Sequence, residues 1–233
     1  MADTLSNMEN GGLIVAVDGP SGTGKSTMCR ALAKRLDAKY VDTGAMYRVA
    51  TLAVLRAGVD PADTAKVIEA TTDLPLEVSD DPDSTEVLFA GEDVKAEIRG
   101  SEVTKHVSAV SAVPEVRVNL VELQRKLARE AGRAIVEGRD IGTVVLPDAP
   151  AKVFMTASAE VRAKRRYDQD VAAGREADFD AVLADVQRRD DADSSRATSP
   201  LKPADDAVLV DTSEMTPDEV LAALTEVVER SAR

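Results

Sequence analysis

The sequence predicts an α/β fold with a five-stranded parallel sheet and helices on both of its faces. Five short runs are too brief and too continuously apolar for surface helices, and Val and Ile recur in them. Continuous apolarity indicates strands that are covered on both faces. Helical patterns separate the runs, and this alternation is typical of a doubly wound sheet. The expected strands span residues 13–18, 39–42, 134–137, 152–156 and 207–211.

The predicted helices are recognised by apolar residues that recur every three or four positions. Such seams lie at residues 28–36, 113–127, 179–186 and 220–227. The last of them is preceded by Thr216, Pro217 and Glu219, which combine an N-cap, a proline at the first helical position and a capping-box glutamate. Each seam predicts the apolar face of a helix.

Two segments interrupt the alternation of strands and helices. Residues 74–97 have the pattern of a hairpin-like insert, and residues 159–200 are highly charged, with arginines in clusters. We therefore predict one domain over residues 13–233, with an insert at about 72–100 and a lid at about 159–190. Residues 1–12 are polar and acidic, and we predict a disordered tail there.

The composition restricts the possible partners. The chain has 233 residues and a net charge of -13, so it is a poor general binder of nucleic acid or anionic membranes. Its one cysteine, Cys29, excludes an internal disulfide and suits a reducing compartment. No apolar stretch approaches the roughly 18 residues that span a bilayer. We expect a cytoplasmic monomer with no nucleic-acid or membrane partner.

The strongest motif is a phosphate-binding loop over residues 19–26. It fits G-x-x-x-x-G-K-[ST] at every fixed position, and it follows a predicted strand and precedes a predicted helix. In such loops, backbone amides bind phosphate oxygens, the lysine reaches the β- and γ-phosphates, and the hydroxyl ligates Mg²⁺. The motif predicts ATP and Mg²⁺ as cofactors, with Ser26 as the metal ligand; the alternative is a glycine-rich turn that only connects strand to helix. The predicted ATP-binding residues are Gly19, Pro20, Ser21, Gly22, Thr23, Gly24, Lys25, Ser26 and Thr27.

The loop does not define the reaction, because several classes of ATPase and kinase use it. The chain lacks the Asn-Lys-x-Asp guanine signature and is short for a motor, which favours a small-molecule kinase. Arg48 and Arg139 follow the second and third predicted strands, so they are expected at the same sheet edge as the loop. Their charges near a triphosphate favour a second anionic ligand, and the alternative is that they form structural ion pairs.

Five segments carry a further resemblance: residues 18–26, 42–48, 92–99, 136–150 and 188–197. Together they resemble bacterial cytidylate kinases, a group of nucleoside monophosphate kinases. The resemblance implies phosphoryl transfer from ATP to CMP or dCMP, an enlarged monophosphate-binding insert and a mobile lid. Two departures stand out: Thr43 occupies a position that is often serine, and Glu137 one that is often aspartate, which leaves its role near Mg²⁺ open.

The resemblance also implies three sets of acceptor contacts. They are Arg48, Arg139 and Arg196 for the phosphate, Thr43, Arg117 and Asp140 for the cytosine, and Ser108, Arg189 and Asp193 for the sugar. An ionised Asp140 accepts a hydrogen bond from the cytosine amino group, whereas it repels the carbonyl of uracil. An unpaired buried polar group costs about 1–3 kcal/mol, which favours CMP over UMP by roughly tenfold to a hundredfold.

For each of these residues, a purely structural role is the alternative. Asp140 is also placed to cap a helix, Arg117 to lie on a solvated helix face, and Ser108 and Asp193 to serve as loop or cap residues. A kinase for UMP or another small acceptor, and a nucleotide-binding regulatory ATPase, are the alternative functions.

The charged segment after the fourth strand carries the predicted catalytic arginines of a lid, Arg162, Arg165 and Arg166. Their spacing places them on one helical face, and Arg175 follows. A closing lid would neutralise charge on the phosphoryl group during transfer and would exclude water. The alternative is a solvated basic face. With Lys25, they are the predicted catalytic residues. No general base is needed, because the attacking phosphate oxygen is already ionised.

Overall fold

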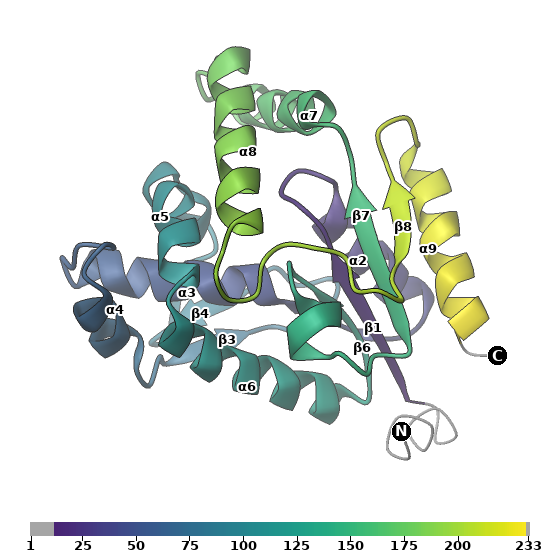
Figure 1. Cartoon of the computed structure of the whole chain (residues 1–233), viewed down its shortest axis with the longest axis horizontal. Helices are drawn as coiled ribbons and strands as arrows, with labels where there is room; N and C mark the ends of the chain where they lie inside the picture. The colour runs from purple at the N-terminus through teal and green to yellow at the C-terminus, as the bar shows by residue number, and fades with distance from the viewer. Residues whose placement is uncertain (1–11, 232–233) are drawn as a thin grey trace.

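The computed structural model describes residues 12–231, so the predicted tail lies almost entirely outside the described residues. Five strands form one sheet in the order β2–β6–β1–β7–β8, and every neighbouring pair is parallel (Figure 1). The predicted parallel sheet is confirmed, and each strand lies within one residue of its predicted bounds. The strands are β1 (Leu13–Asp18), β2 (Lys39–Asp42), β6 (Arg133–Glu137), β7 (Ala151–Thr156) and β8 (Val208–Asp211).

Helices cover both faces of this sheet, as predicted. Along β1, Val15 and Val17 pack against α2 and α9, while Ala16 faces the opposite core, to which α3 and α6 contribute (Figure 1). Alternate residues of one strand are therefore buried on opposite faces, which explains the continuous apolar runs. The helices are α2 (Lys25–Arg35), α3 (Thr43–Arg56), α4 (Thr64–Thr71), α5 (Ser101–Ser111), α6 (Pro114–Ala131) and α9 (Pro217–Ser231).

The edge strand β8 departs from the expectation that every strand is covered on both faces. Val208 is 46% exposed and Leu209 is 65% exposed, and Val210 is the buried residue of this strand. The strand pairs with β7 alone and lies at the end of the sheet, where less protein covers it. The prediction of double coverage is therefore wrong at β8.

A second, three-stranded antiparallel sheet occupies the segment in which a hairpin was expected. It packs on α3 through Val87 and the residues that follow it, in a separate apolar cluster with Val49 and Leu52. At its far turn, the Asp80 carbonyl accepts a hydrogen bond of 2.8 Å from the backbone of Tyr40 in β2. This segment contains β3 (Leu76–Val78), β4 (Val87–Phe89), β5 (Glu92–Asp93) and the short helix η1 (Glu97–Arg99).

Two packed helices, α7 (Ala159–Ala172) and α8 (Phe179–Ser194), stand at the carboxyl end of the sheet (Figure 1). The rings of Tyr167 and Phe179 meet edge to face at 6.2 Å and join the two helices. Within residues 12–231, no helix has the length and apolar character needed to cross a membrane.

Candidate active site

The phosphate-binding loop runs from β1 into α2. Gly19, Gly22 and Gly24 have positive φ angles of 146°, 84° and 91°. A Cβ at Gly19 would lie 2.0 Å from the carbonyl oxygen of Met155, so only glycine fits there. Lys25 Nζ donates a hydrogen bond of 2.7 Å to the Pro20 carbonyl. The loop is thus folded around its own lysine at the start of a helix, where anions bind favourably.

Asp18, the last residue of β1, connects this loop to the segment after β6. Its two carboxylate oxygens accept hydrogen bonds of 2.8 Å from the backbone N–H groups of Ile141 and Gly142. These residues open η2 (Ile141–Val145), a short helical turn. Burial raises the pKa of Asp18 to about 6, against the effect of the two N–H groups. Asp18 therefore fixes the position of Asp140, which immediately precedes η2.

Oxygen ligands lie beside the lysine. Ser26 Oγ donates a hydrogen bond of 2.7 Å to Glu137 Oε1, while Glu137 Oε2 is buried and makes no hydrogen bond among the described residues. Burial, and then repulsion from Asp42, raises the pKa of Glu137 to about 7. A hard divalent cation prefers such oxygens, so this donor set fits Mg²⁺. Within residues 12–231, no cluster of three or more His, Cys, Asp or Glu residues is arranged to hold a metal by itself.

A cavity of about 820 Å³ lies next to Lys25, and most of the predicted site residues line it. All nine predicted acceptor-site residues line it, as do Lys25, Ser26 and the three predicted lid arginines. Within the loop, Ser21, Gly22, Gly24 and Thr27 also line the cavity, whereas Gly19, Pro20 and Thr23 do not. Thr23 instead donates to the Pro20 carbonyl at 3.3 Å and supports the loop from within.

Arg48 is held in the cavity without a carboxylate partner among the described residues. Its Nη1 donates to the carbonyl of Ile98 at 2.8 Å and to Thr104 Oγ1 at 3.0 Å, both of which are neutral acceptors. Burial, and then the nearby charge of Arg189, lowers the pKa of Arg48 to about 9. Because Arg48 is a buried cation beside other cations, an anion in this cavity would be stabilised. Within residues 12–231, the structural ion pair considered for Arg48 does not form.

Asp193 joins two other arginines of the cavity. Arg139 Nε donates to Asp193 Oδ2 at 3.1 Å, Arg196 forms an ion pair with the same carboxylate, and Ser108 Oγ donates to it at 3.3 Å. Burial acts to raise the pKa of Asp193, but Arg139 and Arg196 hold it below its usual value. Arg139 therefore does form the ion pair that was considered for it, and its partner lies in the cavity wall.

Arg117 and Asp140 form a buried ion pair, and each side chain is only 5% exposed. Arg117 Nη1 also donates to the Ser111 carbonyl at 3.1 Å. Asp140 precedes η2, but its side chain makes no capping hydrogen bond. The solvated position considered for Arg117 and the cap considered for Asp140 are both wrong, because each charge neutralises the other. Thr43 lies nearby and donates to the Glu137 carbonyl at 2.7 Å, which leaves its hydroxyl free to accept.

The arginines of α7 contact the phosphate-binding loop. Arg162 Nη1 donates to the Ser21 carbonyl at 3.2 Å, and Arg165 Nη1 donates to the Thr23 carbonyl at 3.2 Å. Arg162 is buried, so the solvated basic face considered for this helix is wrong at that position. Arg166 Nε contacts Asp170 on its own helix at 3.2 Å. The cavity at the carboxyl end of the sheet is thus lined by cations from α2, α3, α6, α7 and α8 and from the segment after β6.

Comparison with known proteins decides the family. The family model described as cytidylate kinase matches residues 15–230. The chain belongs to the cytidylate kinase family. It is 72% identical over 225 residues to a cytidylate kinase of Corynebacterium glutamicum, covering 97% of this chain and 98% of that relative. A cytidylate kinase of Rhodococcus opacus is 64% identical over 225 residues, covering 96% and 98% of the two chains.

A solved structure agrees with the fold of this cytidylate kinase family member. An uncharacterized protein from Eubacterium ventriosum superimposes with a TM-score of 0.54 at 13% identity, over 94% of this chain and 98% of that chain. At this identity the likeness concerns the fold alone.

Sequence reasoning missed several residues that shape the site in this family member. Asp18 directly precedes the phosphate-binding loop, and its position was a usable signal. Thr104, which holds Arg48, and Asp190, which pairs with Arg162, gave no signal. Both lie in helices distant in sequence from their partners, so their contacts depend on tertiary packing.

Proposed function

We propose that this member of the cytidylate kinase family transfers the γ-phosphoryl group of ATP to CMP or dCMP, giving ADP and CDP or dCDP. The observation that carries the proposal is one cavity in which Lys25 lies together with Arg48, Arg139 and Arg196. Two neighbouring anionic ligands account for so many cations in a chain whose net charge is -13. The curated relatives, which bear the name cytidylate kinase, support the same activity.

The donor triphosphate would bind along the phosphate-binding loop. Its backbone amides and the N-terminus of α2 favour the phosphate charges, and Lys25 would move from the Pro20 carbonyl to the β- and γ-phosphates. Ser26, with Glu137 behind it, would hold Mg²⁺. Bound by these residues, the ion would supply positive charge that partly neutralises the phosphates.

The acceptor phosphate would be held by Arg48, Arg139 and Arg196. Arginine forks match phosphate oxygens in pairs and keep their charge at any relevant pH. Asp193 contacts both Arg139 and Arg196, so it would orient two of the three forks. Positioning for in-line attack, together with this electrostatic field, would supply most of the acceleration. The acceptor oxygen is already ionised and requires no general base.

The acceptor base would contact Thr43, Arg117 and Asp140. Asp140 is buried and paired with Arg117, and its carboxylate can accept a hydrogen bond from the cytosine amino group. Uracil has a carbonyl at that position, and two acceptors would face each other. Ser108, Arg189 and Asp193 would contact the sugar, since all three line the same cavity.

The arginines of α7 would act in two ways. Arg162 and Arg165 donate to loop carbonyls, so they would hold the lid against the phosphate-binding loop. Arg166 has its partner, Asp170, on its own helix and would turn toward the transferring group. A closed lid would exclude water and thereby suppress hydrolysis of ATP.

The cavity is complete within one chain, which supports a monomer, and the single buried Cys29 suits a cytoplasmic location.

A coupled assay for ADP tests the proposal, with CMP, dCMP, UMP and AMP as acceptors and a reaction without acceptor. We expect ADP to form rapidly with CMP and dCMP and roughly ten to a hundred times more slowly with UMP. Faster turnover with another acceptor would identify a different kinase. Hydrolysis that is independent of any acceptor would identify a regulatory ATPase.

A further inference from the structure

Gln124 is a fully buried polar residue on the face of α6 that also buries Leu120, Val121 and Ala128. It is 0% exposed, and neither atom of its amide has a hydrogen-bond partner among the described residues. Val121 and Ala128 of the same helix belong to the main apolar cluster. An amide buried in such a place is unfavourable unless it has a polar partner. The Gln124 amide therefore requires a polar partner nearby.

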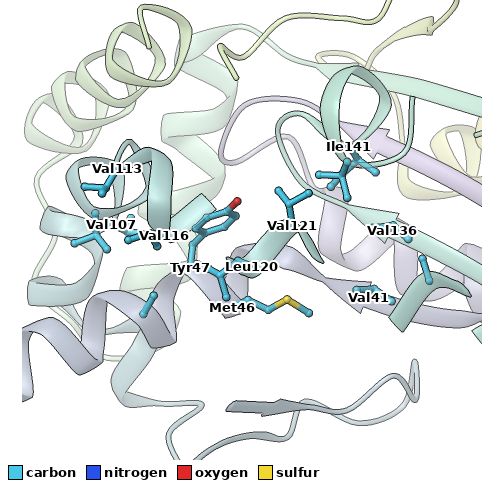
Figure 2. Packing of buried hydrophobic residues seen from close by; sticks show 14 of the residues in the cluster. Val41, Met46, Tyr47, Val107, Val113, Val116, Leu120, Val121, Val136 and Ile141 are labelled. Atoms are coloured by element: carbon cyan, nitrogen blue, oxygen red, sulfur yellow. The ribbon is translucent and has the colours of Figure 1, made fainter. Parts of the chain in front are cut away.

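Tyr47 of α3, a helix that contacts α6, lies near Gln124. Tyr47 packs in the cluster that also contains Val116 and Leu120 of α6 (Figure 2). Its hydroxyl is also buried without a hydrogen-bond partner among the described residues. Burial raises the pKa of Tyr47, while Arg117 and then the adjacent Gln124 amide act in the opposite direction. A hydroxyl and an amide are complementary hydrogen-bonding groups, so each can serve as the partner that the other lacks.

Tyr47 connects this amide to the cavity. It lines the cavity, and the guanidinium carbon of Arg117 lies 5.1 Å from the centre of its ring, within the range of a cation–π contact. Arg117 and Gln124 are seven residues apart, so both lie on one face of α6. The guanidinium is thus held at its edge by Asp140 and the Ser111 carbonyl, and on its face by the Tyr47 ring.

We propose that Gln124 is a positioning residue for recognition of the acceptor base, acting through Tyr47 on the Arg117–Asp140 pair. The amide bonds the Tyr47 hydroxyl and fixes the ring, and the ring fixes the plane of the Arg117 guanidinium against the base. The inference rests on the proposed function, since it assumes that Arg117 and Asp140 contact cytosine. It adds a residue that does not line the cavity.

Gln124→Met tests this role, because it removes the amide and keeps most of the side-chain volume. Loss of one hydrogen bond corresponds to about a fivefold change in an equilibrium constant. We expect KM for CMP to rise about fivefold and the preference for CMP over UMP to fall by a similar factor, with KM for ATP changed less than twofold. Equal changes in both KM values, or an unchanged preference, would overturn the proposal.

Tyr47→Phe removes the same hydrogen bond from its other partner and keeps the ring. It should reproduce the Gln124→Met values, and the double variant should show about fivefold rather than about 25-fold loss, because a shared interaction is lost only once. Multiplicative losses would contradict the proposal. Tyr47→Phe alone also decides the matter if Gln124→Met does not fold.

Leu224→Ala in α9 is the stability control, since Leu224 is fully buried in the core on the opposite face of the sheet. It should lower the melting temperature and leave the preference for CMP unchanged. A fall in that preference with Leu224→Ala would show that destabilisation alone explains the other variants. If the wild-type enzyme does not phosphorylate CMP, the proposed function fails. If it does, and neither single variant alters the preference, only the role of Gln124 fails.

Discussion

Replacing Asp140 with alanine should abolish much of the preference for CMP over UMP. In the proposed function, the carboxylate accepts a hydrogen bond from the amino group of cytosine and repels the carbonyl of uracil. An acceptor left facing an acceptor costs about 1–3 kcal/mol, so its removal should reduce the ratio of kcat/KM values by about tenfold to a hundredfold. The ratio should fall because CMP becomes a poorer substrate and UMP loses its repulsive contact.

The same substitution should also lower the free energy of unfolding, because Asp140 belongs to a buried ion pair. Arg117 and Asp140 are each only 5% exposed. Removing one member of a buried ion pair leaves an uncompensated charge and typically costs about 3–5 kcal/mol. Denaturant unfolding of the wild type and of Asp140→Ala measures this loss. Kinetics should be recorded at a temperature at which both proteins are folded.

Asp206→Ala provides a matched control for the loss of a carboxylate. Asp206 is largely exposed and contacts the buried Lys152 at 2.7 Å, and neither residue lines the cavity. This control should lower stability without changing the ratio for CMP and UMP. If folded Asp140→Ala discriminates between the two acceptors as well as the wild type does, the assignment of Asp140 to the base is refuted.

Three further predictions concern the loop, the acceptor phosphate and pH. Lys25→Met should lower kcat by about a hundredfold or more in steady-state kinetics, and a loss below tenfold would contradict its role. Arg48→Gln should raise KM for CMP by roughly tenfold to a hundredfold with KM for ATP nearly unchanged; equal losses for both substrates would count against it. The folded pKa of Asp18 is about 6, above its unfolded value of 3.8, so its contribution to stability is present at low pH and lost as pH rises through 6. Between pH 4 and pH 6.5, the unfolding free energy of the wild type relative to Asp18→Asn should therefore fall by about 2 kcal/mol, and a constant difference would show that Asp18 is not perturbed.

The sequence was sufficient to predict the sheet and the place of the site. Apolar runs define buried strands, and the carboxyl ends of parallel strands share one edge of the sheet. Arg48 and Arg139 each follow such a strand, so their approach to the phosphate-binding loop was predictable from local sequence. The structure places both in the wall of the cavity that Lys25 also lines.

The individual partners of side chains could not be predicted, because they depend on contacts between distant segments. Arg165 and Thr23 are 142 residues apart, yet their hydrogen bond joins the lid to the loop. Asp140 has the local sequence of a helix cap, but a buried arginine from α6 binds it instead. Gln124 lies within an apolar seam and gave no sign that its amide would be buried beside Tyr47. Local patterns report propensity, whereas tertiary packing determines these partners.

The most direct test of the arginine cluster is a crystal structure with CMP and a non-hydrolysable ATP analogue bound together. The CMP phosphate should lie within hydrogen-bond distance of Arg48, Arg139 and Arg196, with the γ-phosphate beside Lys25 and in line with the acceptor oxygen. A CMP phosphate bound outside this cavity, or one that contacts none of the three arginines, would contradict the account.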